Sequence, residues 1–376
     1  MASVIYHPAY RNYSFGGRHP FSPLRVDMTL DLLRELGHEV RPEAPEPATR
    51  EQILDVHADY YVRRVEALSA GEDVPDRRSY GLDTPDTPAF RGMDEAARWH
   101  VGGTLTAARR IIEGDRCVLQ LGGGFHHARS NFASGFCVYN DLALAIRALA
   151  GHGLWVAYID VDVHHGDGVQ QILYDDGRVM TISLHESGEH LFPGSGDVRE
   201  LGAGVGRGLK LNVPLEPLTE GASYLEILDH VVPSALSHFR PGVLVVQAGA
   251  DAHSDDQLGD LLLTTRDYEA IFRRVLGWAD AFTSGRVLFT LGGGYSFHAT
   301  PRVWALLYLL VNGLRVPEET PAAWRQLWRD PAGAALPVAF HDPVASDSDV
   351  ANRDEIARRN RDRARRLLEA AAPHWA

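Results

Sequence analysis

The 376-residue sequence has only two cysteines, Cys117 and Cys137. Two thiols exclude a disulfide framework and a zinc site built from several cysteines, and we expect both to be reduced in a cytoplasmic protein. The start of the chain lacks the charged and apolar regions of a signal peptide. The longest strongly apolar run, 303–311, is far shorter than the ~20 residues of a membrane span. The sequence therefore predicts no membrane segment.

An excess of basic residues is also missing. Lys and Arg number 37 against 50 Asp and Glu, a formal net charge of -13. Nucleic-acid-binding proteins usually carry basic patches, so we expect no nucleic-acid partner. The acidic balance is compatible with a cationic substrate such as a lysine tail or a polyamine. Hydrophobic residues make up 45% of the chain, an ordinary value that allows a large core.

One local order recurs along the chain: a short apolar run, a turn rich in Gly or Asp, and then a helical pattern. The apolar runs are 117–121, 155–159, 243–247 and 287–291. Continuous apolar runs are typical of strands buried on both faces of a parallel sheet. Helical patterns such as 140–150 and 225–238 lie between them, so the chain is predicted to be α/β. Because ligands bind beyond the carboxyl ends of such strands, we expect the polar turns to meet at one edge.

Three residues after predicted strands could bind a metal ion. Asp162 and His164 are two residues apart at a strand end, so both side chains point to one face. Asp251 follows another predicted strand. One imidazole and two carboxylates leave a zinc position open for water, as catalytic sites require. A bound divalent ion lowers the pKa of its water to about 7.

Two adjacent histidines and a tyrosine could complete such a site. His126 and His127 follow a Gly-rich turn, while Asp160 and Asp167 lie in the metal segment. A carboxylate bonded to an imidazole fixes its tautomer and raises its basicity, so two His–Asp pairs could supply a general base and an electrostatic partner. Tyr295 follows three glycines, and its phenol could donate to a developing oxyanion.

Seven segments in order resemble the histone deacetylase family, most of all its bacterial acetoin-utilisation branch. The similarity runs from about Tyr13 to about Asn312. The segments are GGGFHHA at 122–128, SGFCVYND at 134–141, DVDVHHGDG at 160–168, SLH at 183–185, FPGSGD at 192–197, GAD at 249–251 and GGY at 293–295. The resemblance implies an arginase/deacetylase α/β fold with a central, mainly parallel eight-stranded sheet flanked by helices.

The resemblance also implies two metal sites. Zn²⁺ would be held by Asp162, His164 and Asp251. A K⁺ ion would use the side chains of Asp160 and Ser183, with backbone carbonyls of Asp162, His164 and Leu184. Without the resemblance, Asp160 and Ser183 would be interpreted as residues that cap turns.

The resemblance further assigns catalytic and substrate-binding roles. His127 with Asp167 corresponds to the general base and acid, His126 with Asp160 to the electrostatic partner, and Tyr295 to the phenol that polarises the carbonyl. The substrate-binding residues would be the tunnel walls and the rim, namely Phe136, Phe192, Leu258, Gly135 and the rim carboxylate Asp86.

The implied activity is zinc-dependent removal of an acyl group, in first place acetyl, from a lysine side chain in a peptide or protein. Acetylpolyamines or other small N-acyl amines are the main alternative substrates. A binuclear manganese ureohydrolase is a second alternative, because Asp251, His253 and Asp255 form an Asp-x-His-x-Asp pattern. A non-catalytic acyl-ligand-binding protein is a third alternative, but it would be expected to lack a ligand, a base or the tyrosine, and none is missing.

Three positions depart from the family pattern. The turn before Tyr295 has three glycines where related enzymes often have four, which puts the fixed position of Tyr295 in doubt. Gln257 stands where Pro is common, and Phe125 where Leu is frequent. We expect the last two to adjust packing only.

The chain is predicted to be a single deacetylase domain over 1–376, with a C-terminal extension from 315 to 376. The extension includes an Arg-rich amphipathic helix over 352–372 that docks on the domain or on a neighbouring subunit. The polar stretch 70–92 is predicted to be a functional rim or a disordered loop. The oligomeric state stays open, with a homodimer among the options.

Overall fold

The computed structural model describes residues 2–17, 19–343 and 350–375. These residues form one seven-stranded sheet in the order β1-β2-β7-β6-β3-β4-β5, with every neighbouring pair parallel. The strands are β1 (Ser3–Ile5), β2 (Cys117–Gln120), β3 (Val156–Asp160), β4 (Val179–Glu186), β5 (Lys210–Leu215), β6 (Val243–Gln247) and β7 (Val287–Thr290). The predicted α/β fold is confirmed. The predicted eighth strand is not, because the described residues form seven.

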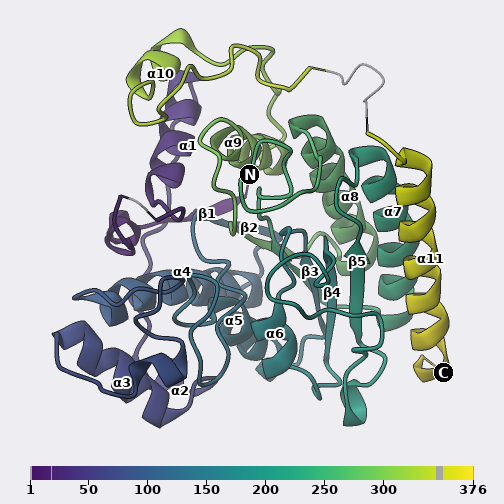
Figure 1. Cartoon of the computed structure of the whole chain (residues 1–376), viewed down its shortest axis with the longest axis horizontal. Helices are drawn as coiled ribbons and strands as arrows, with labels where there is room; N and C mark the ends of the chain where they lie inside the picture. Colours follow the sequence, from purple (N-terminus) through teal and green to yellow (C-terminus); the bar gives the residue numbers. More distant parts are fainter. Residues whose placement is uncertain (1, 18, 344–349, 376) are drawn as a thin grey trace.

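Helices lie on both sides of the sheet (Figure 1). They are α1 (Leu24–Glu35), α2 (Arg50–Leu54), α3 (Asp59–Ala70), α4 (Met93–Ile112), α5 (Asp141–Gly151), α6 (Asp167–Ile172), α7 (Gly221–Phe239), α8 (Thr265–Thr283), α9 (Thr300–Val311), α10 (Ala322–Leu327) and α11 (Arg353–Ala371). Four short 3₁₀ helices join them, η1 (Pro8–Asn12), η2 (Arg77–Tyr80), η3 (Gly204–Gly206) and η4 (Ala372–His374). No helix among the described residues is long and apolar enough to cross a membrane.

Two hydrophobic cores fill the space between the sheet and its helices. Successive side chains of a strand point to opposite faces, so Ala157 and Ile159 of β3 enter one core while Val156 and Tyr158 enter the other. The first core contains residues of α1, α7, α8 and α9, and the second contains residues of α3, α4 and α5. All residues of β3 and β6 are buried, which explains why both strands are mainly apolar up to their last residues, Asp160 and Gln247.

The C-terminal helix α11 packs against this chain's own sheet edge, beside β5 and α7 (Figure 1). Ala364, Leu367 and Ala371 join the first hydrophobic core. The fully buried Asn360 accepts a hydrogen bond from the backbone N–H of Glu216 at 2.9 Å. A side chain of α11 thus satisfies a backbone group just beyond the end of β5.

Residues 71–92, nearly all of the polar stretch 70–92, form a surface loop that contains η2 and is held by ion pairs. Arg77 donates to Asp83 at 2.7 Å, and Arg64 pairs with Asp76 at 2.5 Å. The loop delivers Asp86 to the carboxyl edge of the sheet, where its carboxylate accepts the backbone N–H of Gly135 at 2.7 Å.

Strand register sets the position of the functional residues. Gln120, Thr290, Gln247, Asp160 and Ser183 stand side by side across β2, β7, β6, β3 and β4. Four of these five are the last residues of their strands. The turns that follow β2, β3, β6 and β7 therefore leave the sheet at the same level, as predicted from the four apolar runs.

Candidate active site

Asp162, His164 and Asp251 converge in the structure. Each offers one potential ligand atom, and these atoms all lie within 4.8 Å of one another in a buried position. His164 Nδ1 is 3.1 Å from Asp162 Oδ1 and 3.2 Å from Asp251 Oδ2. The three side chains come from the turns after β3 and β6, which are neighbouring strands.

The other carboxylate oxygens of this cluster are held by protein donors. Asp162 Oδ2 accepts Gln247 Nε2 at 2.6 Å and the backbone N–H of Gly293 at 2.9 Å. Asp251 Oδ1 accepts the backbone N–H of Val163 at 3.0 Å. Each aspartate therefore keeps one oxygen directed at His164 while the other is fixed, which is the outer shell of contacts expected around metal ligands.

The residues present fit a Zn²⁺ ion. Ligands about 2.0–2.2 Å from a tetrahedral ion lie roughly 3.3–3.6 Å from each other, close to the separations of His164 from the two carboxylates. Burial and the charge of Asp162 raise the pKa of Asp251 to about 7 against the opposing effect of His164. Two buried carboxylates repel each other in this way unless a cation lies between them.

His126 and His127 lie beside the metal cluster, each paired with a carboxylate as predicted. His126 Nδ1 is 2.8 Å from Asp160 Oδ2, and His127 Nδ1 is 2.8 Å from Asp167 Oδ1. The two Nε2 atoms face each other at 3.0 Å. Arg129 donates to the second oxygen of Asp167 at 2.9 Å, so that carboxylate is fixed from both sides.

The environment separates the pKa values of the two imidazoles. Burial and then the charge of His126 lower the pKa of His127 to about 3, although the bond to Asp167 opposes them. Burial also acts to lower the pKa of His126, but the charges of Asp160 and Asp162 outweigh it and raise that pKa to about 9. The two imidazoles thus have pKa values shifted in opposite directions, an arrangement typical of acid–base chemistry.

The glycine-rich turn after β7 lies against the metal cluster. A Cβ atom on Gly293 would come 1.9 Å from Asp251 Oδ2, and Gly294 has a positive φ of 126°. Only glycine allows the close approach at Gly293, and glycine is the residue that favours the backbone conformation of Gly294. Tyr295 follows, and its backbone N–H donates to Asp256 Oδ2 at 2.5 Å. Three glycines are thus enough to carry the turn past the potential metal ligands.

Phe136 and Phe192, the predicted walls of a substrate tunnel, contact residues of this centre. Phe192 is 44% exposed, and its ring stands edge-on to His127 with the centroids 5.0 Å apart. Phe136 stands edge-on to Tyr295 at 5.6 Å. Leu258 is half-buried in the loop that follows Asp251.

Asp160 and Ser183, the predicted potassium ligands, are direct neighbours across β3 and β4. Asp160 Oδ2 accepts Tyr158 Oη at 2.6 Å besides facing His126, and Oδ1 accepts the backbone N–H of Asp162 at 3.1 Å. Ser183 Oγ is 2.8 Å from His185 Nδ1.

Residues 19–310 match the histone deacetylase domain. The chain belongs to the histone deacetylase family. The acetoin utilization protein AcuC of Bacillus subtilis (strain 168) is 40% identical over 95% of this chain and 94% of its own length. AcuC of Staphylococcus xylosus is 34% identical over 97% of this chain and 96% of its own.

Solved structures of histone deacetylase homologues share this architecture. A histone deacetylase homologue complexed with SAHA superposes with a TM-score of 0.85 at 26% identity, covering 96% of this chain and 99% of its own. A homologue from Aquifex aeolicus gives a TM-score of 0.84 at 26% identity and the same coverage. The predicted family and its arginase/deacetylase fold are therefore confirmed, and the family is one of hydrolases.

The ureohydrolase alternative is not favoured by the positions of His253 and Asp255. Its second metal would need His253 and Asp255 next to Asp251. The buried His253 instead contacts Asp342 at 2.8 Å, and Asp255 is exposed near His298. Within the described part of the chain, only one cluster of potential metal ligands occurs.

Sequence reasoning missed several residues that orient the site. Gln247 on Asp162, Tyr158 on Asp160 and Arg129 on Asp167 each lie one or two residues outside a family motif. Only Gln247 carries a local signal, since a buried amide at the end of an apolar strand needs a polar partner. Asp256 is not among the predicted site residues, yet it holds the backbone of Tyr295.

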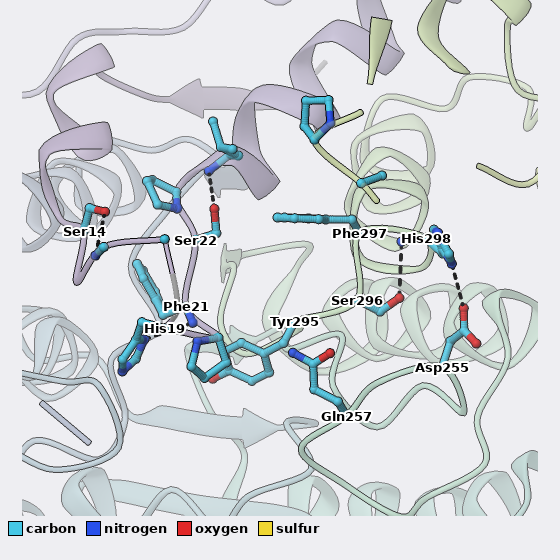
Figure 2. Close-up of a pocket in the computed structure, with 17 residues that line it drawn as sticks. Ser14, His19, Phe21, Ser22, Asp255, Gln257, Tyr295, Ser296, Phe297 and His298 are labelled. Atoms are coloured by element: carbon cyan, nitrogen blue, oxygen red, sulfur yellow. Dashed lines mark hydrogen bonds and ion pairs between the residues drawn. The ribbon is translucent and has the colours of Figure 1, made fainter. Parts of the chain in front are cut away.

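A cavity of about 790 Å³ opens on one side of Tyr295. Figure 2 shows Tyr295 between His19 and Gln257, all three of which line this cavity. It also shows the ion pair between Asp255 and His298. The His19 ring also stands edge-on to Phe136 at 4.5 Å. The cavity thus lies beside the residues predicted to line the substrate tunnel.

Proposed function

We propose that the protein is a zinc-dependent deacylase that removes an acyl group, in first place acetyl, from a lysine side chain. The observation that carries this proposal is that the predicted metal ligands and the paired histidines converge. The three potential metal ligands and two carboxylate-paired histidines meet at the carboxyl edge of the sheet. Family membership supports hydrolysis of an acyl amide at this place.

Zn²⁺ held by Asp162, His164 and Asp251 would supply a Lewis acid that polarises the acyl carbonyl and acidifies a water molecule. His127, neutral because its pKa is low, takes a proton from the attacking water. Its Nδ1 proton stays on the hydrogen bond to Asp167, which fixes the tautomer. His127 then gives the proton to the amine nitrogen as the C–N bond breaks.

His126 and Tyr295 stabilise the negative charge that develops on the acyl oxygen. Asp160 keeps His126 oriented beside His127, and its charge raises the pKa of His126. The Tyr295 hydroxyl donates a hydrogen bond to the oxyanion. Burial, then the charges of Asp251 and Asp162, raise the pKa of Tyr295 well above 10, so the phenol keeps its proton.

The aromatic walls and the rim select the substrate. Phe136 and Phe192 enclose the aliphatic stem of the acyl-lysine, with Leu258 as a further wall. Asp86 receives the substrate backbone at the rim, where its second oxygen is already bound to Gly135. A carboxylate at the rim can accept hydrogen bonds from the backbone N–H groups of a peptide substrate.

The same proposal includes a K⁺ site and a single catalytic domain over 1–376. The side chains of Asp160 and Ser183 and the carbonyls of Asp162, His164 and Leu184 are the K⁺ ligands. Their support is the pairing of Asp160 with Ser183 across neighbouring strands. We place the protein in the cytoplasm, where both of its cysteines stay free.

The test compares turnover of a fluorogenic acetyl-lysine peptide with turnover of N-acetylputrescine, using zinc-reconstituted and chelator-treated protein. Zinc-dependent turnover of the peptide is expected. Asp251→Ala should lose both the bound zinc and the activity, because one of three ligands is removed. Preference for the amine would move the substrate to small N-acyl amines, and turnover of neither substrate by protein with one zinc per chain would contradict the proposal.

A further inference from the structure

Asp342 lies outside the segment that matches the family domain, yet its carboxylate binds two parts of that domain. Oδ2 accepts His253 Nε2, the backbone N–H of Thr265 and Thr265 Oγ1, each at 2.8 Å. Oδ1 accepts Arg302 Nη2 at 2.8 Å. His253 and Arg302 are 2% and 1% exposed. A single carboxylate therefore satisfies a buried imidazole and a buried guanidinium.

The contact with His253 fixes the loop that begins at Asp251. The backbone N–H of Asp255 donates to His253 Nδ1 at 3.0 Å, so this nitrogen carries no proton. The ring proton lies on Nε2 and is donated to Asp342. The carbonyl of His253 accepts the backbone N–H of Asp256 at 2.8 Å. Asp342 thereby fixes the ring of His253, and His253 binds the loop through both its ring and its backbone carbonyl.

The contact with Arg302 fixes the loop that carries Tyr295. Arg302 lies in the first turn of α9, and its Nε donates to the carbonyl of His298 at 2.7 Å. The two loops also bind each other, because Asp256 Oδ2 accepts the backbone N–H groups of Tyr295 and Ser296 at 2.5 and 3.1 Å. Tyr295 is therefore held between a loop fixed by His253 and a loop fixed by Arg302.

We propose that Asp342 is a positioning residue that keeps Tyr295 in its catalytic place through His253 and Arg302. This inference rests on the proposed function, in which Tyr295 donates to the oxyanion. A carboxylate is required because donors approach both oxygens and one donor is a buried cation. An amide at this position would turn one of its N–H groups toward a donor.

The test uses full-length zinc-loaded protein with Asp342→Asn, and Asp115→Asn as the matched control. Asp115 is also a partly buried carboxylate bound by an arginine and a hydroxyl, Arg110 at 2.9 Å and Ser3 at 2.6 Å. Its side chain is 28% exposed and that of Asp342 is 20% exposed. Asp115 lies just before β2, at the opposite edge of the sheet from the active site.

Two measurements are made on these variants. In hydrogen exchange, Asp342→Asn should speed the exchange of the amides of Asp255 and Tyr295 by ~10-fold or more, and Asp115→Asn should not. In kinetics, Asp342→Asn should lower kcat by ~10-fold and leave KM nearly unchanged. When the same substitution is added to the Tyr295→Phe variant, it should lower kcat by less than about twofold.

Unchanged exchange in both loops would overturn the proposal. A loss of kcat of equal size in the Tyr295→Phe background would also overturn it, because that result describes a general structural role. If Asp342→Asn does not fold, Asp342→Glu is tested in the same way, since it keeps the charge but moves the oxygens. Absence of turnover by the wild type would contradict the proposed function alone, and hydrogen exchange would still decide the role of Asp342.

Discussion

The side-chain amide of Gln247 donates to Oδ2 of Asp162 at 2.6 Å, from the last residue of β6 to the turn after β3. The amide orientation is fixed, because Gln247 Oε1 accepts the backbone N–H of Gly249 at 2.7 Å. Asp251 lies two residues after Gly249 in the same turn. The strand that delivers one potential metal ligand thus also orients a second ligand on its neighbour.

Gln247→Leu should weaken zinc binding by about 10- to 100-fold, the usual effect of losing a group that orients a metal ligand. Zinc affinity is measured by competition with a chromogenic chelator. Gln120→Leu is the control, because Gln120 is equally buried at the end of β2 but contacts Tyr10 and His100. Equal zinc affinities in the two variants would contradict the role of Gln247.

Tyr295→Phe should lower kcat by about 10²–10³-fold and leave zinc content unchanged, because it removes one oxyanion donor. Steady-state kinetics on the acetyl-lysine peptide and metal analysis of the purified protein check this. Tyr308→Phe, on α9, should change neither quantity. Near-normal turnover by Tyr295→Phe would remove Tyr295 from the mechanism.

Phe192→Ala should raise KM for the acetyl-lysine peptide by about 10-fold with a small change in kcat. A substrate stem that packs on an exposed ring gains roughly 1–2 kcal/mol of binding that is equal in the ground and transition states. Leu327→Ala serves as control, because Leu327 is an exposed apolar residue of α10. A fall in kcat at constant KM would show that Phe192 acts on the chemistry instead.

Lys210→Met should change how stability depends on pH. Burial lowers the pKa of Lys210 to about 7, against the charges of Asp176 and Asp175, while an unfolded lysine has a pKa of about 10.4. Between these values the folded protein binds fewer protons, so this lysine makes the free energy of unfolding rise with pH. The contribution of Lys210 to the free energy of unfolding is fully present above about pH 10 and is lost as the pH falls through about 7.

Urea unfolding at pH 7.0 to 9.5, in steps, measures the difference between wild type and Lys210→Met. This difference should grow by up to about 1.4 kcal/mol per pH unit in favour of the wild type. The ammonium contacts the carbonyls of Val179 and Asp176 at 2.5 and 3.3 Å. A difference that does not vary with pH would mean that Lys210 keeps an ordinary pKa.

Much of the fold was predictable because its signals are local. The apolar runs predicted for β2, β3, β6 and β7 match the observed strands to within one residue at each end. Full burial on both faces leaves few alternatives for such runs. Strands β1, β4 and β5 were not located from the sequence. β1 has only three residues, and β4 and β5 bury polar side chains such as Glu186 and Lys210.

The residue types of the metal and histidine cluster were also readable from the sequence. Asp162 and His164 share a strand end, and each motif histidine has a carboxylate in the next segment. Whether Asp251 would reach them depended on the order of strands in the sheet, since β6 lies next to β3 and β7. That order is set by packing of the whole chain and is not visible in any one segment.

The sequence alone determined the chemistry available to this protein, because donor types and strand-end turns are local properties of the chain. Only the tertiary structure decided which side chains orient that chemistry. Gln247 meets Asp162, and Asp342 meets His253 and Arg302, through contacts between distant segments. Such contacts form only where strand register and core packing bring the segments within hydrogen-bonding distance, and no local pattern records that distance.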